Sequence, residues 1–287
     1  MAWALRSHGK LPNINVALTS TVPRSGGVSS SAALEMAFGV IWNRLAKLGL
    51  TNVQLAKLGQ RCENGFVGVN SGIMDQMASA MGKQNMAMFL DTRSLEIEYA
   101  PIPQGLSAVL CDTRKPRALT ESAYNERRSQ CEAASEALGV KFLRDATLEL
   151  LESKKDSVSE VVYRRARHVV TEDDRCVRFK EALRLSDLTK IGELMRDSHT
   201  SLRDDYEVSC AELDFMAEAA QSAPGCVGAR MTGAGFGGSC VALVKTEELD
   251  RFVEQTLNQY RANSGREGAA MSCGFVEGAR VLENSNG

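Results

Sequence analysis

Apolar and polar positions along the chain form patterns that predict both strands and helices. Residues 14–19 alternate between apolar and polar side chains, as a half-buried strand does. After residue 29 the spacing becomes helical, with the serines at 29–31 as candidate N-caps and Gly49 as a candidate C-cap. The predicted apolar face of this helix consists of Leu34, Ala37, Ile41, Leu45 and Leu48.

Strands and helices continue to follow one another along the rest of the chain. Further helices are predicted over about 52–66, from about 73 to 81, through most of 121–202, over 210–222 and over 248–262. Further strands are predicted over 86–91, 96–100, 108–112, 227–231, 241–244 and 271–276. Because these elements do not repeat as a regular strand–helix–strand unit, the pattern favours an α+β protein with helices layered on largely antiparallel sheets.

Composition fits an ordinary globular protein and narrows its partners. The 287 residues are 44% hydrophobic and 24% charged, with a formal net charge of -2. This balance gives no overall positive field for nucleic acid or an acidic membrane, so an anionic substrate would need local backbone donors and a cation. No apolar run approaches the roughly 20 residues of a membrane span. The eight cysteines include no C-x-x-C pair and are interpreted as small apolar residues of a cytoplasmic protein.

A glycine- and serine-rich segment precedes the first long helix. Residues 23–32 read Pro-Arg-Ser-Gly-Gly-Val-Ser-Ser-Ser-Ala. Glycines let backbone amides approach a phosphate, and the helix start adds unpaired donors and a positive dipole end. The segment lacks the Gly-Lys-Ser/Thr ending of a Walker A motif. It is therefore either a phosphate-binding loop or simply a capped helix start.

A second glycine-rich loop lies far along the chain, at 231–238, with the sequence Met-Thr-Gly-Ala-Gly-Phe-Gly-Gly. Its glycines can take positive φ and wrap an anion. The alternative is a tight turn between two strands. Two such loops in one chain favour nucleotide binding.

Two carboxylates lie between these loops. Asp75 is predicted in the first turn of a helix, where a negative charge is favourable on electrostatic grounds alone. Glu63 is predicted at the end of the preceding helix, where a solvated surface acid is the ordinary interpretation. Near phosphate-binding loops, however, such a pair can serve as a metal ligand and a catalytic base.

Together these segments resemble motifs of the GHMP small-molecule kinases. The serine-rich loop resembles the second motif of that family, and 231–238 resembles the third. Segments similar to the galactokinases in particular are 63–68 (ENGFVG), 72–76 (GIMDQ), 91–95 (DTRSL), 124–131 (YNERRSQC) and 195–205, which contains Ser198-His199 and Arg203-Asp204-Asp205. The matches run in the same order from about residue 18 to beyond residue 244.

The resemblance implies a fold and a set of binding residues. It implies a GHMP-kinase-like two-lobed fold, with a partial N-terminal lobe at 1–112 and a C-terminal lobe at 113–287. It places the phosphates of ATP on Ser25, Gly26, Gly27, Val28, Ser29, Ser30 and Ser31. It assigns Mg²⁺ to Ser31 and Glu63, a set of oxygen ligands that suits this hard cation.

The resemblance also assigns the sugar site and the catalytic base. Asp75 would accept the proton of the anomeric hydroxyl, and Gly72 and Tyr124 would join it in contacting the sugar. Tyr124 is otherwise an ordinary half-buried helix aromatic. The third motif, with Gly233, Gly235, Gly237 and Gly238, would shape the floor beneath nucleotide and sugar. The implied activity is phosphorylation of galactose at its 1-hydroxyl by ATP, as in galactose metabolism.

One part of the family pattern is not found in the sequence. Galactokinases begin with an arginine that lies beside the catalytic aspartate and a Gly-Glu-His-Thr-Asp-Tyr stretch that grips the sugar. Residues 1–22 contain Arg6 and His8, but no Glu-His or Thr-Asp pair. We expect a truncated sequence, in preference to a natural short homologue or a partner chain that supplies the missing part. The corresponding expectations are an incomplete N-terminal lobe, weak or absent activity of the chain alone, and self-association through exposed apolar surface.

Several functions remain open at this stage. The leading one is a galactose 1-kinase, and a kinase for N-acetylgalactosamine or another hexose belongs to the same class. A non-catalytic sensor that binds sugar and ATP, and presents a surface to a regulator, is the alternative from another class. An oligomeric structural protein that inherited the fold is disfavoured by the two glycine-rich loops and the two carboxylates.

Overall fold

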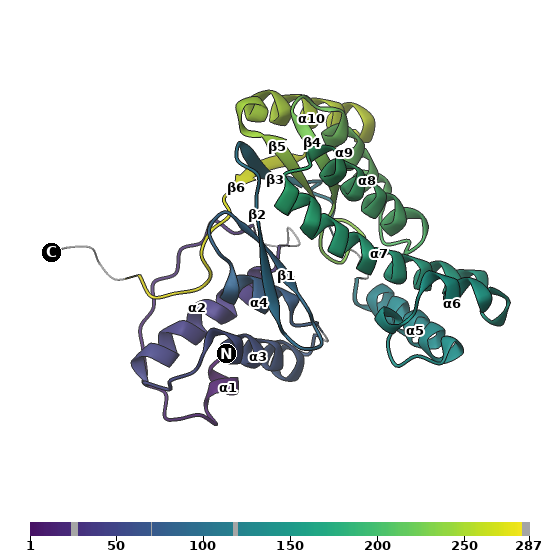
Figure 1. Ribbon diagram of the computed structural model, residues 1–287. Coiled ribbons are helices and arrows are strands. Elements are labelled where there is room, and N and C mark those ends of the chain that lie inside the picture. Colours follow the sequence, from purple (N-terminus) through teal and green to yellow (C-terminus); the bar gives the residue numbers. More distant parts are fainter. Residues whose placement is uncertain (24–27, 70, 117–119, 283–287) are drawn as a thin grey trace. The chain divides into compact units, whose positions relative to one another are not determined.

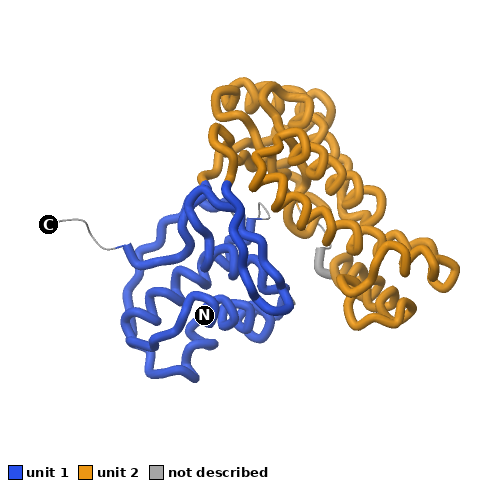
Figure 2. Tube along the Cα trace, viewed as in Figure 1, with its two compact units in different colours: residues 1–101, 275–287 blue, residues 102–274 orange. Residues whose placement is uncertain are grey.

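The computed structural model describes residues 1–23, 28–69, 71–116 and 120–282 (Figure 1). Its contacts divide the chain into two compact units (Figure 2). Unit 1 comprises residues 1–101 together with the returning segment 275–287, and unit 2 comprises residues 102–274. Each unit has its own hydrophobic core, so each is described by itself.

Unit 1 is a small group of helices beside a two-stranded hairpin (Figure 1). Its elements are α1 (Ala2–Leu5), α2 (Ser30–Leu45), α3 (Asn52–Cys62), a π-helical turn (Glu63–Val67), α4 (Met74–Met81), β1 (Met86–Leu90) and β2 (Ile97–Pro101). A capping box between Thr51 and Gln54 starts α3. Leu5, Met36, Leu55 and Met77 are fully buried where the helices meet. This apolar centre holds α2, α3 and α4 together.

Two predictions for the N-terminal part are wrong. Residues 14–19 form no strand, and Leu18 is 60% exposed; no described strand pairs with this segment, and a strand needs such a neighbour for its backbone hydrogen bonds. The predicted apolar face of α2 is also misplaced, since Leu34 and Leu45 are exposed. The helix instead buries Ala32, Glu35, Met36 and Gly39. Small residues bring it close to its neighbours, and a Cβ on Gly39 would lie 2.9 Å from Cε of Met1.

Unit 2 is built on a four-stranded antiparallel sheet with the strand order β4-β5-β3-β6. The strands are β3 (Leu106–Asp112), β4 (Cys226–Met231), β5 (Ser239–Lys245) and β6 (Ala269–Cys273). The helices are α5 (Thr120–Leu138), α6 (Leu148–Ser153), α7 (Glu160–Leu185), α8 (Leu188–Asp204), α9 (Ala211–Ser222) and α10 (Leu249–Ser264), with 3₁₀ turns at 143–145, 155–157 and 246–248. Both α8 and α9 pack against β4. At this contact a Cβ on Gly192 would lie 2.2 Å from the carbonyl oxygen of Val227.

The predicted α+β class, with helices layered on antiparallel sheets, is confirmed. The compact units differ in two places from the predicted division at residue 112. Strand β3 lies in unit 2, because it pairs with β5 on one side and with β6 on the other. The segment after residue 274 returns to unit 1, where the amide of Gly278 donates to the carbonyl of Gly82 at 2.9 Å.

Two further findings concern the described residues as a whole. No helix among them is long and apolar enough to cross a lipid bilayer. All eight cysteines are free, and Cys62, Cys111 and Cys240 are buried. Burial raises the pKa of the Cys111 thiol to about 12, so this sulfur behaves as an apolar side chain.

Candidate active site

The start of α2 is the described part of the predicted phosphate loop. Ser25, Gly26 and Gly27 lie outside the described residues. Ser29 is the N-cap residue in a left-handed conformation (φ 56°, ψ 46°), and its side chain makes no capping hydrogen bond. Ser29 holds the predicted N-cap position but does not cap the helix with its side chain, because a left-handed residue lacks the extended geometry of a capping serine. Ser29 thus leaves the first-turn amides of α2 to other acceptors, as an anion site requires.

Ser31 and Glu63 meet between α2 and the end of α3. The Ser31 hydroxyl donates to Oε1 of Glu63 at 3.2 Å. Glu63 is only 8% exposed, and its other oxygen, Oε2, is buried and has no hydrogen-bond partner. A buried carboxylate oxygen without a partner is costly, and either a cation or the proton of the neighbouring Glu35, whose pKa is raised to about 7, satisfies it. The pair therefore fits the predicted Mg²⁺ ligands, a carboxylate and a hydroxyl that leave other coordination positions to phosphate and water.

The loop between α3 and α4 connects the segment that carries Glu63 to the helix that carries Asp75. Glu63 begins the π-helical turn, an irregularity that is frequent at functional sites. Asn64 closes the loop, since its Oδ1 accepts from the amide of Ser71 at 3.1 Å. Gln60 supports the same point by donating its Nε2 to the carbonyl of Ser71 at 3.2 Å. The chain therefore leaves α3 at Glu63 and enters α4 in a fixed orientation.

Asp75 lies in the first turn of α4, as predicted, and is half-buried. Gly72, just before the helix, is exposed, and a Cβ there would meet no atom within 4 Å. Ser31, Glu63, Gly72 and Asp75 thus belong to unit 1, on elements that pack together. Their arrangement suits a carboxylate that is accessible to a ligand and a second one that is withdrawn from water.

Two buried polar residues on α2 and α4 were not predicted from the sequence as part of the site. Glu35 is 7% exposed and Gln76 is 2% exposed, and Nε2 of Gln76 donates to Oε2 of Glu35 at 3.1 Å. Burial, together with the nearby charge of Glu63, raises the pKa of Glu35 to about 7. A signal was present, because Glu35 is the only charged residue between positions 30 and 42 and lies one helical turn after Ser31.

Tyr124 and the third motif lie in unit 2. Tyr124, on α5, is 44% exposed, so the half-buried alternative understates its accessibility. Gly233, Gly235, Gly237 and Gly238 all have positive φ. At Gly235 a Cβ would lie 2.1 Å from the carbonyl oxygen of Val208, so this position has no room for a side chain.

The amides of the third motif are partly used by the fold itself. Phe236 donates its amide to the carbonyl of Val208 at 2.8 Å, and Gly238 donates to the carbonyl of Lys115 at 3.3 Å. The hydroxyl of Thr113 donates to the carbonyl of Gly238 at 2.6 Å. These bonds agree with the alternative of a tight turn and fix the loop as a shaped surface. The amides of Phe236 and Gly238 are not free to wrap a phosphate.

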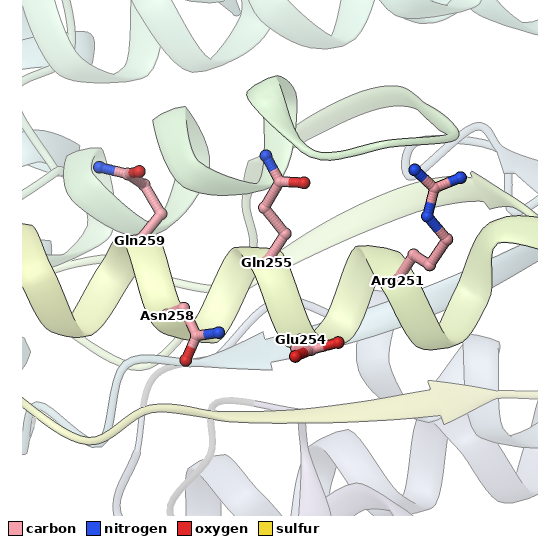
Figure 3. A pocket seen from close by; sticks show the side chains of 5 residues that line it. All are labelled: Arg251, Glu254, Gln255, Asn258 and Gln259. Carbon is pink, nitrogen blue, oxygen red and sulfur yellow. The ribbon is translucent and has the colours of Figure 1, made fainter.

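A hollow on α10 lies apart from every predicted site residue in the sequence. Arg251, Glu254, Gln255, Asn258 and Gln259 line it, all from α10 (Figure 3). These side chains belong to the polar face of an amphipathic helix. The hollow has no part in the function proposed below.

Comparisons with known proteins agree with this arrangement. The family model described as the GHMP kinases N terminal domain matches residues 1–83, and that of the GHMP kinases C terminal matches residues 179–263. The galactokinase of Roseiflexus sp. (strain RS-1) is 40% identical over 98% of this chain and 74% of its own length. The galactokinase of Lactiplantibacillus plantarum is 43% identical over 91% of this chain and 69% of its own length.

Solved structures give the same result. The crystal structure of Lactococcus lactis galactokinase complexed with galactose superposes with a TM-score of 0.87 and 38% identity, covering 91% of this chain and 69% of that one. The L. major mevalonate kinase, at 20% identity and a TM-score of 0.58, shares the fold over 90% of this chain and 68% of its own. The resemblance seen in the sequence is confirmed, and the chain belongs to the galactokinase family of the GHMP kinases.

Proposed function

We propose that the protein transfers the γ-phosphate of ATP to the 1-hydroxyl of D-galactose, giving galactose 1-phosphate and ADP. Two findings support galactose as the acceptor: the 40% identity to a galactokinase and the fold shared with a galactokinase that is complexed with galactose. The observation that carries the proposal is the buried, unpartnered Oε2 of Glu63 beside the Ser31 hydroxyl. That pair is a site for a cation at the start of a helix that can bind phosphate.

Each group of residues has a distinct task in this proposal. The segment from Ser25 to Ser31 binds the phosphates, and Ser31 with Glu63 holds Mg²⁺. When bound, Mg²⁺ supplies positive charge that neutralises the phosphate oxygens. Gly72 and Tyr124 contact the sugar, and the third motif (Gly233, Gly235, Gly237 and Gly238) forms a surface beneath the ligands.

Asp75 is the proposed general base. Its carboxylate orients the 1-hydroxyl of galactose and takes its proton as the bond from O1 to the γ-phosphorus forms. The bond between the γ-phosphorus and the bridging oxygen breaks, and its electron pair leaves with ADP. Phosphoryl transfer needs alignment and charge neutralisation more than covalent help from the protein. The half-buried position of Asp75 in the first turn of α4 suits this task, because its backbone is held by the helix and its side chain keeps some access to a ligand.

ADP release with ATP, Mg²⁺ and galactose tests the proposal, with Asp75→Asn as the key variant. General-base catalysis contributes about 10²- to 10⁴-fold, so the variant should lose that much of the rate while it still binds ATP. Asp250→Asn is a matched control, since Asp250 also lies in the first turn of a helix, α10. Its rate should equal that of the parent.

A panel of sugars separates the alternatives. Faster turnover of N-acetylgalactosamine or another hexose than of galactose would contradict the proposed substrate. Equal rates for the parent and Asp75→Asn would contradict the proposed base. Sugar-dependent binding of a regulator that survives in Asp75→Asn, without turnover in the parent, would support the sensor instead.

A further inference from the structure

We propose that Glu35 and Gln76 are a pair of positioning residues that fix the first turn of α4, and with it Asp75, against α2 and α3. The inference rests on the proposed function, because it takes Asp75 to be the base. Neither residue touches a reacting atom in this proposal. Their role is to set the rotation and register of the helix that carries the base.

The hydrogen bond between the two side chains joins two helices. Gln76 follows Asp75 directly and is 2% exposed, and Met77 and Ala80 are buried on the same helix. Its Nε2 donates to Oε2 of Glu35 on α2 at 3.1 Å. Neighbouring residues on a helix point about 100° apart, so holding Gln76 inside turns Asp75 to the edge of the buried region. Asp75 is half-buried, as this geometry requires.

The third helix is shaped to receive the pair. A Cβ on Gly59 of α3 would lie 3.0 Å from Cγ of Gln76 and 3.3 Å from Oε2 of Glu35. The missing side chain at this position therefore makes the room in which the two polar side chains meet. The contact involves α2, which carries Ser31, α4, which carries Asp75, and α3, which ends directly before Glu63.

Stability alone does not account for the pair. It lies in an apolar cluster that includes Met36, Leu55 and Met77. One oxygen of each side chain, Oε1 of Glu35 and Oε1 of Gln76, is buried without a partner, which lowers stability. An apolar pair of similar volume would pack there at least as well. An apolar pair, however, does not fix the position of α4 in the same way. A hydrogen bond requires a specific distance and angle, whereas dispersion contacts persist when the helix shifts slightly along its axis.

Glu35 also links the base to the phosphate-binding end of α2. It lies one helical turn after Ser31, so both side chains leave the same face of the helix. A shift of Glu35 would therefore involve the serine as well as Gln76. One buried hydrogen bond thus sets the relation between two parts of the site in unit 1.

The test replaces the pair with apolar side chains in the full polypeptide that carries this sequence. Glu35→Leu and Gln76→Met are made singly and together, Glu35→Gln keeps an acceptor for the Gln76 amide, and Gln255→Met is a control on the exposed face of α10. Each single apolar variant should be less stable, since it leaves the other polar group alone. The double variant should unfold at a temperature at or above that of the parent.

The kcat values of the variants distinguish a positioning role of the pair from a purely stabilising one. We expect the double variant to lose about 10- to 100-fold in kcat, as small misplacements do, while its KM values for ATP and galactose change by less than about threefold. Glu35→Gln and Gln255→Met should keep kcat within about threefold of the parent. A stable double variant with the parental kcat would overturn the proposal, as would a Glu35→Gln variant as slow as the double variant.

A second readout does not depend on turnover. The methyl group of Met77, on the inner side of α4, can be observed by NMR after isotope labelling, with Met216 in the core of unit 2 as a reference. In the double variant we expect Met77 to give two or more signals, or one strongly broadened signal, while Met216 stays unchanged. A single sharp Met77 signal would contradict a positioning role. If the parent releases no ADP with galactose, the proposed function fails, and the Met77 signal still decides the role of the pair.

Discussion

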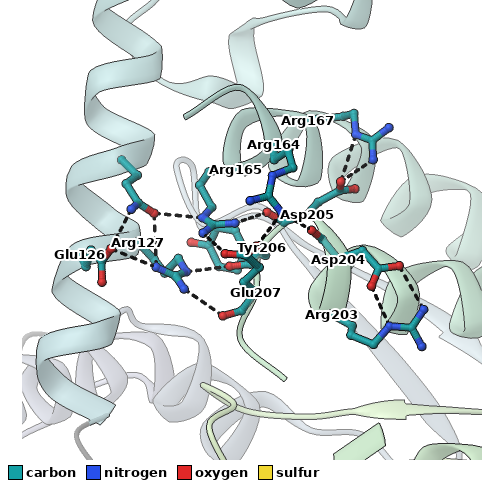
Figure 4. Close-up of polar contacts among 11 residues, drawn as sticks. Glu126, Arg127, Arg164, Arg165, Arg167, Arg203, Asp204, Asp205, Tyr206 and Glu207 are labelled. Atoms are coloured by element: carbon teal, nitrogen blue, oxygen red, sulfur yellow. Dashed lines mark hydrogen bonds and ion pairs between the residues drawn. The ribbon is translucent and has the colours of Figure 1, made fainter. Parts of the chain in front are cut away.

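The two units contain buried polar clusters that differ in how completely their groups are paired. In unit 2, arginines from α5 and α7 surround the segment 205–207 after α8 (Figure 4). Arg127 donates its Nε to the carbonyl of Tyr206 at 2.6 Å and its Nη2 to the carbonyl of Glu207 at 2.9 Å. Arg165, which is 2% exposed, forms an ion pair with Glu207 at 2.5 Å. In unit 1, Glu35, Glu63 and Gln76 each keep one buried oxygen without a partner.

This difference separates a structural cluster from a candidate site. The arginine cluster satisfies its charges with carboxylates and backbone carbonyls, so it clamps a loop and needs no ligand. The carboxylate cluster holds two acids close together with too few donors, which is unfavourable until a cation or proton arrives. The carboxylate oxygens without a partner favour a ligand at this cluster, where two acids lie together; Thr256 and Arg266 of unit 2 also keep one buried polar atom without a hydrogen-bond partner, but neither belongs to a pair of acids.

The largest expected effect comes from breaking the arginine cluster. Arg165→Leu removes the buried guanidinium that donates to Gln130, to Glu207 and to the carbonyl of Asp205; Glu207 keeps Arg164 and Gln130 keeps Arg127, whereas the buried carbonyl loses this donor. Breaking a buried hydrogen-bond network and its packing is among the larger effects of single substitutions, so the free energy of unfolding of unit 2 should fall by roughly 4 kcal/mol. Chemical denaturation monitored by a probe in unit 2 measures it. Arg178→Leu removes only an exposed pair with Asp174 and should cost less than about 1 kcal/mol. Equal costs would refute the structural role of the cluster.

Acidification should lower the stability of unit 2 through His168. His168 stacks on Tyr206 with ring centroids 4.5 Å apart, and burial lowers its pKa to about 4. Between its ordinary pKa of 6.5 and about 4, the unfolded chain binds a proton that the folded chain does not. Acidification therefore favours unfolding, and stability should fall by about 3 kcal/mol through this window.

The measurement is the unfolding free energy at several pH values for the parent and for His168→Gln. The difference between the two curves isolates the histidine from the other titrating groups. A pH dependence that persists unchanged in His168→Gln would show that the imidazole is not its source.

The smallest expected effect concerns the surface of unit 1. Phe66 is 66% exposed, Val67 57% and Met74 60%, all close to the candidate site. We propose that these side chains support weak self-association of the chain. Sedimentation velocity at increasing concentration should show it, and Phe66→Ser should reduce it. Leu185→Ser removes an apolar side chain that is 78% exposed at the end of α7 and should have no effect. Association that responds only to Leu185→Ser would place the contact on unit 2.

Most helices and strands, and the family, could be predicted from the sequence. Features that depend on tertiary contacts could not. The apolar spacing predicted α3 and α4, because this period acts locally. The alternation of apolar and polar residues at 14–19 led to a wrong strand prediction, because a strand also needs a neighbouring strand, which a local pattern does not reveal. The face of α2 was misjudged because burial followed Ala32, Gly39 and the charged Glu35 rather than the leucines.

The same limit applies to the candidate site. Ser31, Glu63 and Asp75 could be named from motifs, and the structure places them on elements that pack together in unit 1. In the sequence, Gln76 was named only as the last residue of the segment 72–76, and no role was assigned to it. Its contact with Glu35 joins residues 41 positions apart in the sequence, and no local rule predicts such a pair.

We expect Oε2 of Glu63, the buried oxygen without a partner beside Ser31, to be a cation ligand. Calorimetric titration of ATP with and without Mg²⁺ tests it most directly, on the parent, on Glu63→Gln and on the exposed control Glu254→Gln. Mg²⁺ should tighten ATP binding to the parent and to the control. In Glu63→Gln that enhancement should shrink at least about tenfold, the effect that loss of even an indirect metal contact produces. An equal enhancement in all three proteins would contradict the account.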